Sequence, residues 1–416
     1  MRRLVLVLGI TALLSGCGSL KFWGDDSEGV GDSAERQQDK VDAAADKGKL
    51  PDLPELTDTL SLKREWRVGL GAKQEAFEAI LRPVVADGVA YAANREGRVW
   101  ALGAERGDRR WRTDVDAELT GGVGVGAGLV LLGSMTGELV ALQADTGKEA
   151  WRTRLTSEVV APAAARGDLV VVQTQDAKIH GLAAADGSRR WSFEGDLPVL
   201  TLRGMATPVI TGELVLVGMA NGKLLALDGS SGVVMWEERV AMPSGRTELE
   251  RMVDLNSPVL DGDIVYAVSY QGRVGAYTRG SGRELWTREV SSHHAPAVGR
   301  NQLFIVDDRD RILALRTTGG QELWVNQQLR RRGLTAPLAI GELVAVADSG
   351  GYLHLLSAVD GTLVGRRRVD RNGVTVPMAS DGERILVQSN GGNLTAYRIE
   401  GAVVGSAVSD QDQEQE

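Results

Sequence analysis

The sequence predicts an all-β protein: a single eight-bladed β-propeller of four-stranded antiparallel blades, its ring closed by the N-terminal strand. Three observations predict this fold. Tryptophan recurs 38 to 50 residues apart, at positions 66, 111, 151, 191, 236, 286 and 324. Most of these tryptophans follow a glycine by four residues, and two short apolar runs precede each of them from Trp111 onward. A repeat of about 40 residues with four strands is the size of a propeller blade.

Each unit of the repeat supplies its four strands in a fixed order. The first follows a proline, or Gly122 in one unit, at positions 83, 162, 208, 258, 296, 337 and 377. The second and third are apolar runs such as 129–132 and 139–142, typical of strands buried on both faces, and turns such as Asn221-Gly222 join them. The third carries Ala or Gly in nearly every unit, which leaves room for the tryptophan of the fourth.

The two ends of the repeat predict how the ring closes. The last unit stops near Ile399 without a fourth strand, and a tryptophan strand, 62–68, precedes the first complete unit. We therefore expect the N-terminal strand to complete the last blade. Gly365 occupies the eighth tryptophan slot, so we expect the weakest blade junction there.

The N-terminus has the features of an export signal. Arg2 and Arg3 precede the short apolar run 4–14, which cannot span a bilayer and is followed by Leu-Ser-Gly-Cys17. This tetrapeptide resembles the bacterial lipobox, which implies cleavage after residue 16 and a lipid anchor on Cys17; the alternative is an ordinary signal peptide followed by an unrelated cysteine. Gly18, where lipoproteins of the inner membrane carry Asp, implies the periplasmic face of the outer membrane.

Charge divides the rest of the chain. The net charge of −9 belongs to the ends, because residues 61–399 hold 40 basic and 40 acidic side chains. We expect residues 17–60 to be a disordered tether, 61–400 the propeller, and 401–416 a disordered acidic tail. The export signal, rather than the charge, argues against a nucleic-acid partner.

The sequence offers no catalytic or metal-binding constellation. His180 and His354 repeat one strand position and are expected to be structural, and the spacing of the four histidines matches no metal motif. The arginine runs 330–332 and 366–368 are expected on neighbouring blades, either as a solvated face or as a partner site. We expect no cofactor.

The segment 141–151 resembles the tryptophan motif of pyrroloquinoline-quinone dehydrogenases, which also have eight blades. These enzymes use vicinal cysteines, whereas this chain has a single cysteine. The resemblance therefore implies fold rather than activity. A membrane-tethered quinoprotein-like dehydrogenase remains the alternative function.

Three connections between blades exceed the usual length of about 11 residues, at 67–82, 192–207 and 237–257. We expect them on one face of the ring, where loops on a rigid scaffold carry function. The second contains Leu200, Leu202 and Arg203, and the third contains Asp254 and Asn256. Exposed Leu beside Arg is typical of a protein contact, although such loops could simply cover the ring.

At these residues the chain resembles the BamB family, the propeller lipoproteins of the outer-membrane β-barrel assembly machinery. The matching segments are Cys17, 66–71, 200–204, 245–251 and 254–256. The resemblance implies a non-enzymatic scaffold that docks the POTRA domains of the central barrel subunit and helps insert outer-membrane proteins. It places the partner-binding side chains at Leu200, Leu202, Arg203 and Asp254, with Asn256 where the family often has a second Asp. Strand edges on the rim are a further hypothesis, as binding sites for nascent outer-membrane proteins.

Overall fold

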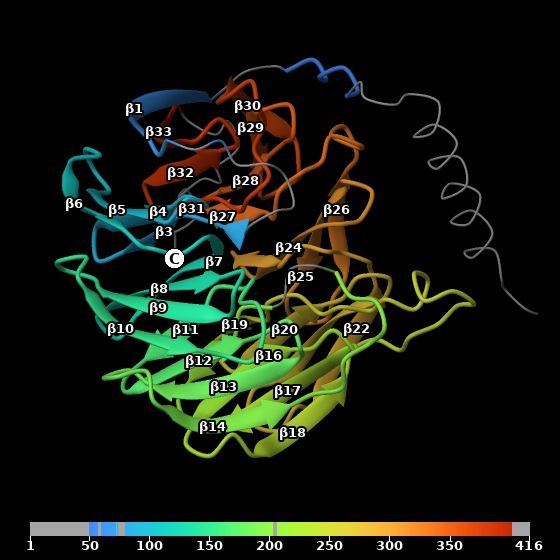
Figure 1. The fold of residues 1–416 in the computed structure, drawn as a ribbon. Coiled ribbons are helices and arrows are strands. Elements are labelled where there is room, and N and C mark those ends of the chain that lie inside the picture. Colours follow the sequence, from blue (N-terminus) through green and yellow to red (C-terminus); the bar gives the residue numbers. More distant parts are fainter. Residues whose placement is uncertain (1–49, 57–59, 72, 74–79, 203–205, 402–416) are drawn as a thin grey trace, which may run out of the picture. The chain divides into compact units, whose positions relative to one another are not determined.

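The structure is a computed structural model that describes residues 50–56, 60–71, 73, 80–202 and 206–401. All regular elements in these ranges are β-strands, and they form eight sheets (Figure 1). Within the described ranges no helix has the length and apolarity needed to cross a membrane. Cys17 and the segments 1–49 and 402–416, which hold the predicted signal, most of the tether and the tail, lie outside the described residues.

Each sheet is one blade, and its strands follow one another from the inside of the ring outward. The innermost strands are β3 (Val84–Ala86), β7 (Leu119–Gly126), β11 (Ala164–Arg166), β15 (Val209–Thr211), β19 (Val259–Asp261), β23 (Ala297–Gly299), β27 (Leu338–Ile340) and β31 (Ala379–Ser380). The second strands are β4 (Val89–Ala93), β8 (Leu129–Ser134), β12 (Leu169–Gln173), β16 (Leu214–Gly218), β20 (Ile264–Val268), β24 (Gln302–Val306), β28 (Leu343–Ala347) and β32 (Arg384–Ser389).

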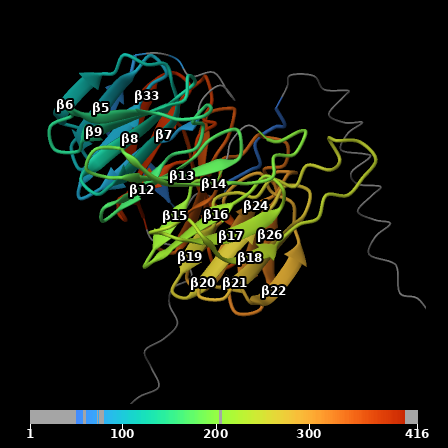
Figure 2. The ribbon, with the colours of Figure 1, turned by 60° about the horizontal axis from the view of Figure 1, so that its bottom comes forward.

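The outer half of each blade carries the third and fourth strands. The third strands are β5 (Arg98–Gly103), β9 (Glu138–Gln143), β13 (Lys178–Ala183), β17 (Lys223–Asp228), β21 (Arg273–Thr278), β25 (Ile312–Arg316), β29 (Tyr352–Ser357) and β33 (Asn393–Glu400). The fourth strands are β6 (Arg109–Asp114), β10 (Glu149–Arg154), β14 (Arg189–Glu194), β18 (Val234–Arg239), β22 (Glu284–Glu289), β26 (Glu322–Asn326), β30 (Leu363–Arg368) and β1 (Ser61–Gly69). We number the blades 1 to 8 in this order; Figure 2 shows β15 to β18, blade 4, side by side.

The N-terminal strand closes the ring, as the sequence predicts. β1 pairs antiparallel with β33, from Ser61 opposite Glu400 to Gly69 opposite Asn393. An ion-pair network fixes this pairing, because the carboxylate of Glu65 accepts hydrogen bonds of 2.5 Å from both Arg384 and Arg398. Burial opposes ionisation of Glu65, but these two guanidinium groups hold its pKa below the ordinary value.

The seven repeating tryptophans join each blade to the next and act as wedges between them. Each ring lies against a turn glycine of the following blade, at positions 107, 147, 187, 232, 282, 320 and 361, all with φ between +68° and +73°. Each indole Nε1 also donates a hydrogen bond of 2.8 or 2.9 Å to a backbone carbonyl of that blade, at residues 104, 144, 184, 229, 279, 317 and 358. A side chain at any of these glycines would collide with the ring. Each junction therefore requires both the tryptophan and the glycine that the repeat supplies.

The junction between blades 7 and 8 uses a different lock, which explains why Gly365 replaces tryptophan. The third and fourth strands of blade 8, β33 and β1, are not consecutive in the chain, so no turn joins them for an indole to cover. Leu60 fills the place instead. Its carbonyl oxygen would lie 3.0 Å from a Cβ at Gly365, and its side chain is buried in the core of blades 7 and 8.

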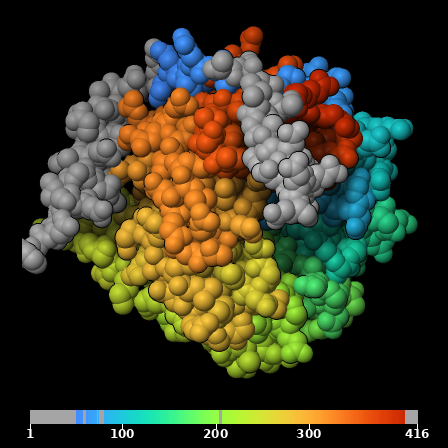
Figure 3. Space-filling model, turned by 180° about the vertical axis from the view of Figure 1, so that it is seen from behind, coloured from blue at the N-terminus to red at the C-terminus, as the bar shows by residue number. Residues whose placement is uncertain are grey.

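The segment before β1, residues 50–56, which we call the strap, lies on blade 7 (Figure 3). Arg332 donates a hydrogen bond from Nη1 to the carbonyl of Pro51, and Arg366 donates one of 3.0 Å to that of Pro54. Asp348, completely buried, accepts 2.7 Å from Arg332 Nε and 2.9 Å from His354 Nε2. The expectation that these arginine runs form a solvated face is therefore wrong for Arg332, which is buried, because its guanidinium satisfies polar groups of the strap and of blade 7.

The first long connection adds a strand that the sequence does not predict. β2 (Ile80–Leu81) pairs in parallel with β7, the innermost strand of blade 2, and makes that sheet five-stranded. Arg82 follows it and reaches the hydroxyl of Thr207, 3.5 Å away and just before β15 of blade 4. The described end of this connection, residues 80–82, therefore lies on the inner side of the ring.

We expect Gly365→Trp to lower the stability of the chain, because the new ring must displace Leu60. Leu60→Ala should lower the free energy of unfolding by about 2–4 kcal/mol through the cavity it creates. The double variant should lose less than the sum of the two, since the ring can then enter the vacated space. Urea denaturation of the three variants measures these changes; a higher midpoint for Gly365→Trp would contradict the assignment.

Candidate functional site

The two remaining long connections lie next to each other and form the candidate site. The leucine loop, residues 195–208, joins β14 to β15, and the long loop, residues 240–258, joins β18 to β19. Two hydrogen bonds tie them together: Leu202 N donates 2.9 Å to Asp254 Oδ1, and Thr207 N donates 2.8 Å to Ser257 Oγ. The structure thus brings together two of the segments that the sequence predicts on one face of the ring.

Large apolar side chains gather on the solvent side of both loops. They are Leu197, Val199 and Leu200 on the leucine loop and Met242 and Leu249 on the long loop, each between 45% and 79% exposed. Exposed apolar side chains that cluster on adjacent loops of a rigid scaffold indicate a protein-contact surface, whereas single exposed apolar side chains are ordinary and need no partner. We call this set the apolar tips.

The tip of the long loop is held by its own hydrogen bonds. Thr247 and Glu250 form a reciprocal capping pair: Glu250 N donates 3.2 Å to Thr247 Oγ1, and Glu250 Oε2 accepts from the backbone of Arg246 and Thr247 at 2.7 and 3.2 Å. Gly245, at φ +121°, leaves room for the Glu250 side chain, which a Cβ there would meet at 2.4 Å. Gln271 on the neighbouring hairpin donates 2.8 Å to the carbonyl of Leu249. The loop is therefore built to keep one shape.

Asp254 lies inside the site rather than on its surface. Only 7% of the residue is exposed; Oδ1 accepts the Leu202 hydrogen bond, while buried Oδ2 has no partner among the described residues. Burial raises the pKa of Asp254 to about 7, although the Leu202 N–H favours the ionised form. The side chain therefore positions the leucine loop, and a partner could reach it only by displacing protein.

Asn256 also makes an internal contact. Its Nδ2 donates 2.9 Å to the carbonyl of Ser292, in the connection that enters blade 6. Its backbone N–H donates 3.0 Å to the carbonyl of Val268, the last residue of β20. The amide thus joins the base of the long loop to blades 5 and 6, a role that Asp could not fill because it has no N–H to donate.

The remaining site residues divide between the surface and the undescribed part of the chain. Leu200 is exposed, Leu202 is half-buried beside Asp254, and Arg203 lies outside the described residues. Met242 and Leu249 are not among the contact residues that the sequence predicts. The signal that could have found them is an apolar side chain inside an otherwise polar insertion.

The described residues contain no group of three or more His, Cys, Asp or Glu side chains placed to hold a metal ion. The adjacent rings of His293 and His294 are 4.0 Å apart, and burial lowers the pKa of both. His180 is buried among Thr156, Thr174 and Ser192, each 3.3 Å from a ring nitrogen. These histidines therefore belong to the scaffold.

Comparison with known proteins gives one consistent family. A family profile described as outer membrane protein assembly factor BamB matches residues 58–121, 95–326 and 317–405. The protein of that name from Pseudomonas aeruginosa is 52% identical over 356 residues, 85% of this chain and 94% of the relative. The Escherichia coli protein of the same name is 36% identical over 363 residues, 84% of this chain and 92% of the relative.

Solved structures agree on the fold. The crystal structure of BamB from Moraxella catarrhalis matches with a TM-score of 0.74 at 28% identity, over 81% of this chain and 99% of that chain. A quinohemoprotein alcohol dehydrogenase from Pseudomonas putida matches with a TM-score of 0.65 at 14% identity, over 82% of this chain and 77% of that chain. The second likeness shows the propeller fold alone.

We expect Asp254→Asn to remove a pH dependence of stability. The pKa of Asp254 is about 7 in the folded chain and about 3.9 in an unfolded one. Its contribution to the free energy of unfolding is therefore fully present below about pH 4 and is lost as pH rises through 7. Relative to the native chain, the variant should therefore gain on the order of 1–4 kcal/mol in free energy of unfolding between pH 4.5 and 8. Urea titrations at several pH values measure this, and a difference that stays constant with pH would contradict it.

Proposed function

The chain belongs to the BamB family of outer membrane protein assembly factors, and from that premise we propose that it docks the central barrel subunit of the assembly machinery through the leucine loop and the long loop. It acts as a non-enzymatic scaffold in the assembly of outer-membrane proteins. The observation that carries the docking proposal is the pair of loops fixed together by Asp254 and Leu202, with apolar side chains turned to solvent.

The contacts that we propose are distinct from the ties beneath them. Leu200 and Leu202 supply apolar area, and Arg203 supplies a guanidinium that pairs with carboxylates on POTRA domains of the partner. Asp254 and Asn256 act from below, since their polar atoms already bind Leu202 and Ser292. Loops fixed before binding lose less conformational entropy on docking, which favours affinity.

We further propose that Cys17 carries a lipid that anchors the chain to the periplasmic face of the outer membrane, through the tether of residues 17–60, whose part before the strap is disordered, and with residues 401–416 as a free tail. The lipobox at residues 14–17 supports the anchor. The strap, residues 50–56, is where the described part of the tether lies on blade 7. Outer strand edges, such as that of β18, remain proposed sites for nascent outer-membrane strands.

A quinone-dependent dehydrogenase is less supported. The curated relatives that match over most of the chain carry the assembly-factor name, whereas the enzyme matches in fold at low identity. Saturable binding of pyrroloquinoline quinone and Ca²⁺ with dye reduction would favour the enzyme.

A pull-down of the central barrel subunit tests the proposed surface. We expect Arg203→Glu and Leu200→Glu each to reduce capture by roughly tenfold or more, because one reverses a charge and the other places a charge in an apolar contact. Val359→Glu is the matched control, since Val359 is 63% exposed on a turn of blade 7, away from both loops.

Capture at native levels by both loop variants would refute the surface. Capture lost equally by Val359→Glu would show that added charge, rather than the loops, causes the effect. Asp254→Asn should reduce capture by an intermediate amount, because it weakens the hydrogen bond to Leu202 without changing the apolar tips.

A further inference from the structure

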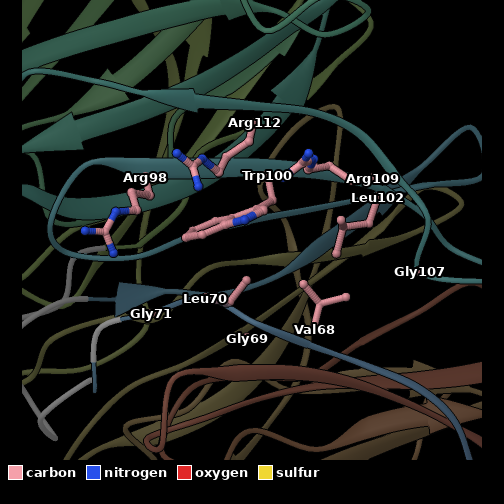
Figure 4. A pocket seen from close by; sticks show the side chains of 10 residues that line it. All are labelled: Val68, Gly69, Leu70, Gly71, Arg98, Trp100, Leu102, Gly107, Arg109 and Arg112. Carbon is pink, nitrogen blue, oxygen red and sulfur yellow. The ribbon is translucent and has the colours of Figure 1, made fainter.

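A second site lies where the ring closes, far in the fold from the two docking loops. A cavity of about 460 Å³ opens between the end of the closing strand, Val68–Gly71, and the outer strands β5 and β6 of blade 1 (Figure 4). Its lining side chains are Val68, Leu70, Arg98, Trp100, Leu102, Arg109 and Arg112. We infer that this ring-closure pocket binds an organic anion, a carboxylate or phosphate carried on an apolar body. The inference does not rest on the proposed function.

The pocket has an apolar floor. Leu70 is 1% exposed and Trp100 5% exposed, and both belong to the core cluster that joins blades 8 and 1. Figure 4 shows the Trp100 indole between Arg112 on one side and Leu70 on the other. At about 460 Å³ the cavity falls within the range of small-molecule sites, and its flat aromatic wall suits a planar or aliphatic group.

Trp100 is not one of the repeating wedges, and its N–H is unlike theirs. The seven wedge tryptophans each donate to a carbonyl at 2.8 or 2.9 Å. Trp100 Nε1 has no acceptor within the described part of the chain. The same strand position in blade 3 holds His180, whose ring nitrogens have three hydroxyl neighbours. An N–H without a protein acceptor, on a side chain that lines the pocket, is a donor available to a ligand.

The remaining polar side chains of the pocket are cations. Arg98 pairs with Glu96 at 2.9 Å, and Arg112 with Asp114 at 3.2 Å. Arg109 has no carboxylate partner among the residues that the structure describes, and no acidic side chain lines the pocket. Among the residues that the structure describes, these three guanidinium groups and two carboxylates leave one positive charge in excess around the cavity, on Arg109.

Together these features select the ligand class. A guanidinium group binds carboxylate and phosphate oxygens with two parallel hydrogen bonds, and the indole N–H adds a third donor. The apolar floor favours an anion carried on an apolar group over a fully hydrated inorganic ion. An apolar group removes water from Leu70 and from the face of the indole, whereas a hydrated ion leaves both surfaces in contact with water. The pocket thus combines one charge, one free N–H and one flat apolar surface.

The test follows the indole N–H signals of the full chain, labelled with ¹⁵N at tryptophan, with Trp100→Phe identifying the Trp100 signal. Phenyl phosphate and benzoate are the anionic probes, inorganic phosphate tests the charge alone, and phenol tests the apolar body alone. We expect saturable shifts of the Trp100 signal with the two aromatic anions, and binding at least roughly tenfold weaker with inorganic phosphate or phenol.

Arg109→Ala should weaken binding of phenyl phosphate by roughly tenfold or more, because it removes the unpaired guanidinium. Arg189→Ala is the matched control, since Arg189 holds the same position of the fourth strand in blade 3. No saturable shift of the Trp100 signal with either anion would overturn the inference, as would equal affinity in Arg109→Ala and the native chain. Inorganic phosphate binding as tightly as phenyl phosphate would overturn the assignment of an apolar body.

Discussion

The pairing of the N-terminal strand with the last third strand is the constraint on which the rest of the structure depends. β1 and β33 come from opposite ends of the propeller sequence, and their register from Ser61–Glu400 to Gly69–Asn393 makes the eight sheets one closed ring. Glu65 reinforces it with hydrogen bonds to Arg384 and Arg398. Without this closure, blade 8 would expose an unpaired edge, and the blade junctions would no longer support one another around the ring.

Closure also creates the local exceptions to the repeat. Because no turn connects β33 to β1, the last junction cannot use the tryptophan lock. Leu60 takes the place of the tryptophan ring, beside Gly365. The strap before Leu60 is then held by Arg332 and Arg366, and the chain leaving β1 opens the pocket beside Trp100. Three features that interrupt the periodic pattern thus have one geometric origin.

The sequence predicts the periodic part of the fold because every unit repeats the same local physics. Trp151 and Gly187, for example, lie 40 residues after Trp111 and Gly147 and make the same contact, so the structure of one unit predicts that of the next. The sequence also marks the two docking loops by their length. It does not reveal that Asp254 is buried, that Asn256 binds Ser292, or that β2 adds a fifth strand, because each depends on contacts between segments that share no period. A polar residue in a loop is expected to be exposed to solvent, and only the structure shows that Asp254 accepts a hydrogen bond from Leu202 N of the neighbouring loop.

The central claim is that the ring presents the leucine loop and the long loop as one docking surface. Site-specific photo-crosslinking tests it most directly: a photoreactive residue replaces Leu200, Leu249 or Val359 in otherwise native chains, and adducts with the central barrel subunit are measured in membranes. The account predicts adducts from positions 200 and 249, which lie on the two loops, and none from position 359 on blade 7. Adducts from position 359 alone, or from none of the three, would contradict it.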